Sequence, residues 1–291
     1  MGGARYAGAL DTAAVRFGIH LPQYGRVASV EAIDRAARHA EERGFADVWV
    51  SDHIIHPAAQ SYPSPYLYEP LVTLAWAAAV TAHVGLGTSV LVLPHHNPLE
   101  LANALASLDA LSGGRVTVGA GVGWSEAEFA ALGYDFGNRG ARTDEIIDVL
   151  RAAWRDDPSS YDGEHYRFTD IRVLPKPAHD IPIWVGGGTG RAHRRAVEKA
   201  DGFQLISVTP AEAAPIIERL RRDRPEEDFT ISLRTGWDPQ GMDPDTIRSE
   251  RDAYEEAGVE HVVAAPWRTT LDDWLRSMDL LADLVDLQPA G

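Results

Sequence analysis

The chain has 291 residues, 45% of them hydrophobic and 24% charged, which is enough for the core of one large α/β domain or of two small ones. Its 43 acidic residues outnumber its 27 basic residues, and the net charge of −16 repels both nucleic-acid phosphates and an anionic membrane surface. The chain contains no cysteine, which excludes disulfides, thiolate nucleophiles, iron–sulfur clusters and cysteine-bound zinc.

The first 14 residues are expected to form a disordered extension. They lack the continuous apolar core of a secretory signal. No later stretch approaches the roughly 20 apolar residues that are needed to span a bilayer. We therefore expect a soluble protein of the cytoplasm that binds neither nucleic acid nor membranes.

Eight short segments are rich in β-branched and other apolar residues, and we expect them to form strands. They are residues 15–21, 47–51, 84–93, 115–121, 181–187, 202–207, 229–237 and 260–267. Near-continuous apolar runs such as VGLGTSVLVL and IPIWVGG are typical of strands buried on both faces, as in parallel sheets.

Segments with a helical period alternate with these strands. They are residues 30–41, 69–81, 97–112, 142–155, 191–200, 211–222, 245–257 and 271–287. Gly44 suits the end of the first helix, and Asn97 followed by Pro98 suits the start of the third.

Eight alternations of strand and helix predict one domain over residues 1–291, folded as a closed (β/α)8 TIM barrel. An open doubly wound sheet is the structural alternative. A dinucleotide-binding sheet of that kind needs G-x-G-x-x-G after its first strand, where this chain has Pro22-Gln23-Tyr24-Gly25.

Two connections are longer than a bare barrel needs, and both are predicted insertion loops. Residues 52–69 follow the second strand, at the end of the barrel where such enzymes place their active sites. Residues 156–180 precede the fifth strand, and their Asp162-Gly163 dipeptide predicts a small hairpin.

Asp52 and His53 stand at the end of the second strand. A carboxylate beside an imidazole at this rim can move a proton near neutral pH. The structural alternative is an aspartate that caps the loop beside a surface histidine.

Three glycine-containing segments end or interrupt strands. In residues 87–90 (GTSV) glycine suits a bulge or the close approach of a ligand, although packing against a helix is the simpler interpretation. In residues 119–124 (GAGVGW) bare backbone gives a flat ring room to lie. Residues 186–191 (GGGTGR) lead into a helix, so their N–H groups and the nearby Arg191, Arg194 and Arg195 favour an anion.

Eleven histidines raise the question of a metal site. His53 and His56 are three residues apart, and His95 and His96 follow the third strand, but His20 stands alone in the first. A metal-dependent barrel hydrolase needs a His-x-His there, so we expect no metal.

These segments, taken in order, resemble the bacterial luciferase-like monooxygenase superfamily, in particular its branch of coenzyme F420-dependent oxidoreductases. The resemblance runs from about residue 16 to residue 207. It is carried by FGIHLP, AEERGFADVWVSDH, LGTSVLVLPHHNP, ASLDALSGGRVTVGAGVGW, NRGARTDEIIDVLRAAW, YDGEHYRF and IPIWVGGGTGRAHRRAVEKADGF.

The resemblance implies a set of site residues around one cofactor ring. Asp52 and His53 match the catalytic pair that approaches the ring. Residues implied to bind the cofactor include Ser89 and Val90, at the family's non-prolyl cis peptide, and Gly121. The phosphate of the cofactor is implied to lie on Gly186, Gly187, Gly188 and Thr189, and the substrate beside His20 and Trp124.

One departure from the family bears on the substrate. Sugar-phosphate dehydrogenases of this branch carry an acidic residue where this chain has Trp124. Glu126 and Glu128 follow, but we expect them to begin a helix and to stabilise its positive end. Oxidation of glucose 6-phosphate is therefore not expected, and the aromatic wall suggests a flatter or more apolar substrate.

Three functions follow from the resemblance. The leading hypothesis is an oxidoreductase that transfers two electrons between F420 and a small organic substrate, with His53 as proton donor or acceptor. The first alternative is an FMN-dependent monooxygenase that uses molecular oxygen. The second is a non-catalytic flavin-binding protein, against which Asp52 and His53 argue. The resemblance also implies a homodimer formed by helices on one side of the barrel.

Overall fold

A computed structural model describes residues 15–58, 64–226 and 228–289. The extension expected over residues 1–14 lies outside the described residues.

All eight expected strands are present, and they close into a parallel barrel in the order β1-β10-β9-β8-β7-β4-β3-β2. The strands are β1 Arg16–His20, β2 Asp47–Val50, β3 Gly85–Val92, β4 Val116–Gly121, β7 Ile183–Gly186, β8 Gly202–Ile206, β9 Thr230–Thr235 and β10 His261–Ala264. The prediction of a (β/α)8 barrel is confirmed, and the open sheet is wrong.

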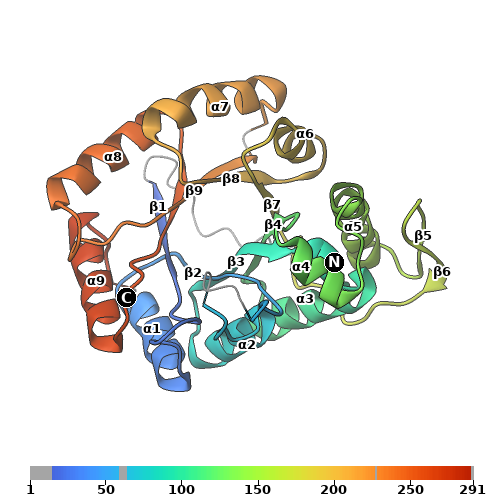
Figure 1. Cartoon of the computed structure of the whole chain (residues 1–291), viewed down its shortest axis with the longest axis horizontal. Coiled ribbons are helices and arrows are strands. Elements are labelled where there is room, and N and C mark those ends of the chain that lie inside the picture. Colours follow the sequence, from blue (N-terminus) through green and yellow to red (C-terminus); the bar gives the residue numbers. More distant parts are fainter. Residues whose placement is uncertain (1–14, 59–63, 227, 290–291) are drawn as a thin grey trace.

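The eight expected helices surround the barrel, one after each strand in turn (Figure 1). They are α1 Val30–Glu42, α2 Pro70–Val80, α3 Pro98–Ser112, α5 Arg139–Arg155, α6 Gly190–Lys199, α7 Pro210–Asp223, α8 Pro244–Glu256 and α9 Leu271–Leu284. Two short helices, η1 Leu93–His95 and α4 Glu126–Leu132, lie in the connections after β3 and β4. No helix within the described ranges is long and apolar enough to cross a bilayer.

Capping residues fix where these helices begin and end. The side chain of Asn97 accepts hydrogen bonds from the first turn of α3, and Gly113 ends that helix with a φ of 76°. Thr209 and Glu212 form a reciprocal capping box at the start of α7. Such contacts satisfy backbone groups that a helix end leaves without partners.

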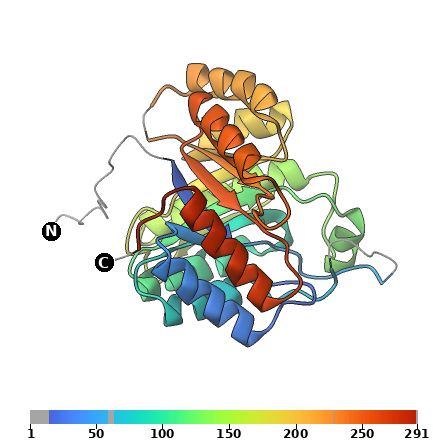
Figure 2. The same cartoon turned by 90° about the vertical axis from the view of Figure 1, so that its left-hand side faces the viewer.

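Both insertions lie outside the ring of strands. The predicted hairpin is confirmed as β5 Ser159–Asp162 and β6 Arg167–Ile171, which project beside α5 (Figure 1). The loop after β2 and the helix α4 lie at the same end of the barrel (Figure 2). That end carries the carboxyl termini of the strands.

The interior of the barrel is not uniformly apolar. The rings of Trp49 and Trp184 stack with centroids 5.4 Å apart, and His261 contacts both rings. Gly18 and Gly87 provide the room, because a Cβ on Gly87 would lie 2.4 Å from the Trp49 ring and one on Gly18 would lie 1.9 Å from the Asp47 carboxylate. Polar groups are therefore built into the core of this barrel.

Candidate active site

A cavity of about 480 Å³ opens at the carboxyl ends of the strands. Each of the eight barrel strands, or the loop that follows it, contributes at least one residue to the wall. Most of the predicted site residues meet there: Asp52, His53, Ser89, Val90, Gly121, Trp124, Gly186 and Gly187. This is the face on which barrel enzymes carry their active sites.

His53 is joined to a buried carboxylate that comes from another loop. Its Nδ1 lies 3.0 Å from Oε2 of Glu128, the residue at the third position of α4. The other carboxylate oxygen, Oε1, accepts hydrogen bonds from the backbone N–H groups of Ile54, at 2.8 Å, and Ile55, at 3.3 Å. Glu128 therefore holds both the imidazole and the chain that follows it.

Glu128 lies in the first turn of α4, as expected, but its carboxylate also binds groups outside that helix. Ser125 caps α4, and the Glu128 side chain turns away from the helix into the loop after β2, where it is 1% exposed. Burial acts to raise the pKa of Glu128, but the hydrogen bond from His53 and the positive charges of His95 and His53 lower it more strongly. The carboxylate is thus ionised beside the imidazole at neutral pH.

Asp52 does not pair with its neighbour His53. One carboxylate oxygen accepts from the backbone N–H of Val92 at 2.9 Å and lies 2.9 Å from Nε2 of His96. Its second oxygen is buried and has no hydrogen-bond partner among the described residues. Asp52 therefore fixes the end of β3, and one of its oxygens is buried without a partner beside the cavity.

Other histidines surround these two pairs. His95 is buried and packs edge-on against Phe129, with ring centroids 4.4 Å apart. Burial lowers the pKa of His95 and of His56. Although six titratable groups gather at this rim, no three His, Asp or Glu side chains in the described part of the chain are placed to hold a metal ion.

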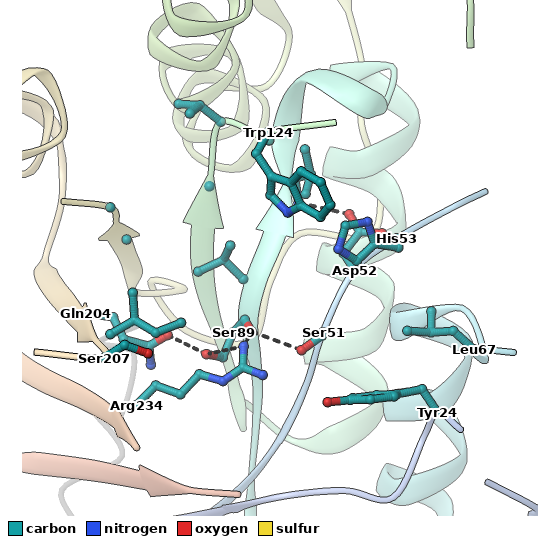
Figure 3. Close-up of a pocket in the computed structure, with 18 of the residues that line it drawn as sticks. Tyr24, Ser51, Asp52, His53, Leu67, Ser89, Trp124, Gln204, Ser207 and Arg234 are labelled. Carbon is teal, nitrogen blue, oxygen red and sulfur yellow. Dashed lines mark hydrogen bonds between the residues drawn. The ribbon is translucent and has the colours of Figure 1, made fainter. Parts of the chain in front are cut away.

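Trp124 stands at the outer edge of the same cluster. Its ring is 58% exposed and meets the ring of His53 edge-on at 5.6 Å. Figure 3 shows Trp124 and His53 together on one side of the cavity and Arg234 on the other. Trp124, which stands where related sugar-phosphate dehydrogenases carry an acidic residue, thus forms part of the cavity wall. The carboxylate beside His53 comes instead from Glu128.

The bulge in β3 forms the floor of the cavity. The Ser89-Val90 peptide bond is cis, as expected, and the pairing with β4 shifts register between Thr88 and Leu91. A Cβ on Gly121 would lie 2.4 Å from the Val90 side chain, and one on Gly186 would lie 3.0 Å from it. Gly121 lines the cavity, and Val90 occupies the space in which a Gly121 side chain would lie.

The glycine loop after β7 leads from the cavity to the start of α6. Gly187 has a φ of 135°, and a Cβ on Gly188 would meet no other atom within 4 Å. Thr189 caps α6 by accepting from Ala192 N–H at 3.2 Å. Gly188 and Thr189 lie beyond the cavity wall, and this open backbone at a helix start suits an anion.

The three arginines expected to assist this loop differ in burial and in ion pairing. Arg195 is buried and forms an ion pair with Asp144. Arg191 and Arg194 are exposed on α6. Only the latter two can supply charge to a ligand without breaking an ion pair.

His20 lies behind the cavity instead of lining it. Its ring is fully buried, 5.1 Å from the ring of Trp267, and Nε2 lies 2.9 Å from Oγ of Ser51. Burial and the charge of Arg234 lower the pKa of His20 well below its usual value. His20, predicted to lie in the substrate pocket, thus does not line the cavity but contacts three residues of its wall, Ser51, Tyr24 and Trp267.

Several residues of the wall were not foreseen. Arg234 of β9 donates to the Ser89 carbonyl oxygen and lies 5.3 Å from the Trp267 ring (Figure 3). Gln204 of β8 binds the Ser89 hydroxyl. Gln204 is a polar residue inside the otherwise apolar strand GFQLI, and Arg234 is a charged residue inside a barrel strand, which are the signals that could have identified them.

Known proteins are similar to this chain in sequence and in fold. A family model described as luciferase-like monooxygenase matches residues 10–237. An F420-dependent glucose-6-phosphate dehydrogenase of Amycolatopsis mediterranei is 33% identical over 184 residues, which cover 61% of this chain and 53% of that protein. The chain thus matches about half the length of this relative.

Two solved structures show the same fold at low identity. A monooxygenase from Streptomyces bottropensis has a TM-score of 0.78 and 22% identity, with 92% of this chain and 98% of that chain covered. An F420-dependent tetrahydromethanopterin reductase from Methanopyrus kandleri has a TM-score of 0.78 and 19% identity, with 95% and 100% covered.

Proposed function

The chain belongs to the luciferase-like monooxygenase family, and from that membership we propose that it is an oxidoreductase that transfers two electrons between coenzyme F420 and a small organic substrate. The observation that carries the proposal is a single cavity in which a His–Glu pair, a β-bulge and an open glycine loop meet. F420 is favoured over FMN because the matched dehydrogenase is named as F420-dependent.

The residues present fit a cofactor of this class. The cavity volume of about 480 Å³ is in the range of small-molecule sites. Val90 gives a ring an apolar surface to rest on, and Asp52 offers a buried oxygen without a partner. Gly188 and the start of α6 leave space and N–H groups for a phosphate.

When bound, the coenzyme supplies hydride chemistry. The protein contributes a proton: Glu128 binds Nδ1 of His53, so the imidazole exchanges its proton with the substrate through Nε2. Ionised Glu128 stabilises the protonated imidazole and fixes its orientation, as a carboxylate does for a catalytic histidine. Trp124 covers this pair from the solvent side.

The shape of the wall restricts the substrate. The rings of Tyr24 and Trp267 lie 5.3 Å apart and are tilted by 43° in the cavity wall, which Trp124 also lines. Aromatic faces bind flat or apolar groups. We therefore assign a flat or apolar substrate, and not a sugar phosphate.

A homodimer is part of the proposal, and the outer face of α2 and α3 supports it. Val72 is 67% exposed and Trp76 is 47% exposed on α2, and Leu111 is 86% exposed on α3. Val72 and Trp76 lie one turn apart on α2, and α2 packs beside α3, so exposed apolar side chains on these two helices support an interface there. Sedimentation of Trp76→Glu as a monomer, beside a dimeric wild type, would support this face.

The test is a titration of the purified protein with F420 and with FMN, followed by quenching of cofactor fluorescence. We expect F420 to bind at micromolar concentrations and FMN to bind more weakly. Binding of FMN alone would favour the flavin monooxygenase instead. Binding of neither would contradict the proposal.

A further inference from the structure

A line of hydrogen-bonded side chains runs from the cavity floor into the barrel. Ser89 Oγ donates to Gln204 Oε1 at 2.5 Å, and Gln204 Nε2 donates to Ser232 Oγ at 3.2 Å. Ser232 Oγ lies 2.9 Å from His261 Nδ1. His261 Nε2 lies 3.0 and 3.1 Å from the two carboxylate oxygens of Asp47. We call these five residues the interior chain.

The register of the sheet builds this arrangement. In the pairing of β8 with β9, Gln204 stands opposite Ser232, and in the pairing of β9 with β10, Ser232 stands opposite His261. Only Ser89 and Gln204 line the cavity. Exposure is 2% or less for four members and 9% for Asp47, so water does not compete for these hydrogen bonds.

Asp47 is the only carboxylate in the interior chain, and it lies at the start of β2, at the opposite end of that strand from the cavity residues Ser51 and Asp52. Burial acts to raise the pKa of Asp47, but the electrostatic interaction and hydrogen bond with His261, the charge of Arg16 and the Trp49 hydrogen bond lower it more strongly. An ionised carboxylate only accepts hydrogen bonds, so Nε2 of His261 must carry a proton.

The hydrogen bonds between His261 and Ser89 also have a defined direction. Ser232 Oγ lies 2.9 Å from Nδ1 of His261 and already accepts from Gln204, so its own proton is directed at Nδ1. Ser232 then accepts from the Gln204 amide nitrogen, which turns Gln204 Oε1 toward Ser89. The single hydroxyl proton of Ser89 is consequently directed at Gln204, away from the ligand.

We infer that Ser89 Oγ serves as a hydrogen-bond acceptor for an N–H or O–H group on the bound cofactor ring, and that Asp47 acts through the interior chain as the positioning residue that fixes this polarity. The inference rests on the proposed function for the identity of the ring. The direction of the interior chain itself does not depend on any ligand.

The Ser89 carbonyl cannot take over this role. It already accepts from the Arg234 guanidinium, and Oγ of Ser51 lies 3.2 Å away. The hydroxyl oxygen gives its proton to Gln204 and accepts only a long contact from Nη1 of Arg234, at 3.5 Å, so one of its two lone pairs is left for a ligand. A ring that offers only acceptors at this point would leave the Ser89 oxygen unpaired on binding, which costs affinity.

The first experiment uses the ligand-free protein. The side-chain ¹⁵N shifts of His261 report its protonation state, assigned by comparison with a His261→Gln variant. We expect a neutral ring with the proton on Nε2 at pH 7, and a shifted Nδ1 resonance in Ser232→Ala. A proton on Nδ1, alone or in a doubly protonated ring, would overturn the proposed polarity.

The second experiment is a double-mutant cycle on affinity for F420, measured by fluorescence quenching. Ser89→Ala and Ser232→Ala should each weaken binding about three- to tenfold, the range for one hydrogen bond. The double variant should bind within about twofold of Ser89→Ala, because both changes remove the same interaction. Multiplying effects, or an unchanged affinity in either single variant, would overturn the inference.

Ser277→Ala is the matched control, because Ser277 is equally buried and hydrogen-bonded but lies on α9. It should leave affinity unchanged. Asp47→Asn tests the role of Asp47 as positioning residue directly. If Asp47→Asn fails to fold, Ser232→Ala still tests the interior chain. A wild type that binds neither F420 nor FMN would contradict the proposed function, while the ¹⁵N measurement would still decide the polarity of the interior chain.

Discussion

Two polar assemblies border the same cavity, and they are built in opposite ways. The rim cluster, which comprises His53, Glu128, Asp52 and His96, pairs charged groups from the connections after β2, β3 and β4. The interior chain takes one residue from each of five strands, and Asp47 is its only carboxylate. Both are buried, but only the rim assembly has a histidine at the cavity wall.

The difference separates two tasks. His53 is 14% exposed and can exchange a proton with a ligand or with water, whereas His261 is fully buried. A group that must change its protonation needs access and a charged partner. A group that must hold one orientation needs a closed network. The rim therefore suits proton transfer, and the interior suits recognition.

The largest expected effect is on the rim. His53→Ala should lower turnover by about 10²- to 10⁴-fold, the usual contribution of a general acid or base, measured as F420 oxidation or reduction with flat aldehydes, ketones and quinones. Glu128→Gln should lower it by roughly tenfold or more, because the imidazole loses its charged partner. Glu126→Gln, an exposed neighbour on α4, is the control. Normal turnover in a folded His53→Ala would contradict the assignment.

The second prediction compares the loss of stability when a methyl group is added at the floor of the cavity, on Gly121, and beyond its edge, on Gly188. Gly121→Ala should reduce the free energy of unfolding by about 1–3 kcal/mol, because its Cβ would lie 2.4 Å from Val90. Gly188→Ala places its Cβ in open space, so its effect should stay within about 0.5 kcal/mol. Urea unfolding measures both, and equal losses would show that the two glycines are not packed differently.

The smallest effect concerns pH. Burial acts to lower the pKa of His96, but the hydrogen bond and charge of Asp52 raise it above the usual 6.5. A raised pKa means that the stabilisation is fully present below 6.5 and is lost as pH rises through the folded value. His96→Gln should therefore cost more stability, on the order of 1 kcal/mol, at pH 6 than at pH 9. The same dependence in an Asp52→Asn background would contradict the pairing.

Much of this could be predicted from the sequence because the signals are local. Apolar runs and helical periods located every barrel element, and Asp52, His53 and the 186–189 loop stand at strand ends. The partner of His53 could not be found in this way, since Glu128 lies 75 positions along the chain and its side chain turns away from its helix. The interior chain depends on strand register, which brings Gln204, Ser232 and His261 opposite one another.

The structure of the protein with F420 bound tests the central claim most directly. We expect the ring on Val90 with an N–H or O–H group at Ser89 Oγ, the substrate side facing His53, and the phosphate on the 186–189 loop. A phosphate bound instead at the ends of β9 and β10, near Gly236 and Trp267, or a ring that does not reach Ser89, would contradict it.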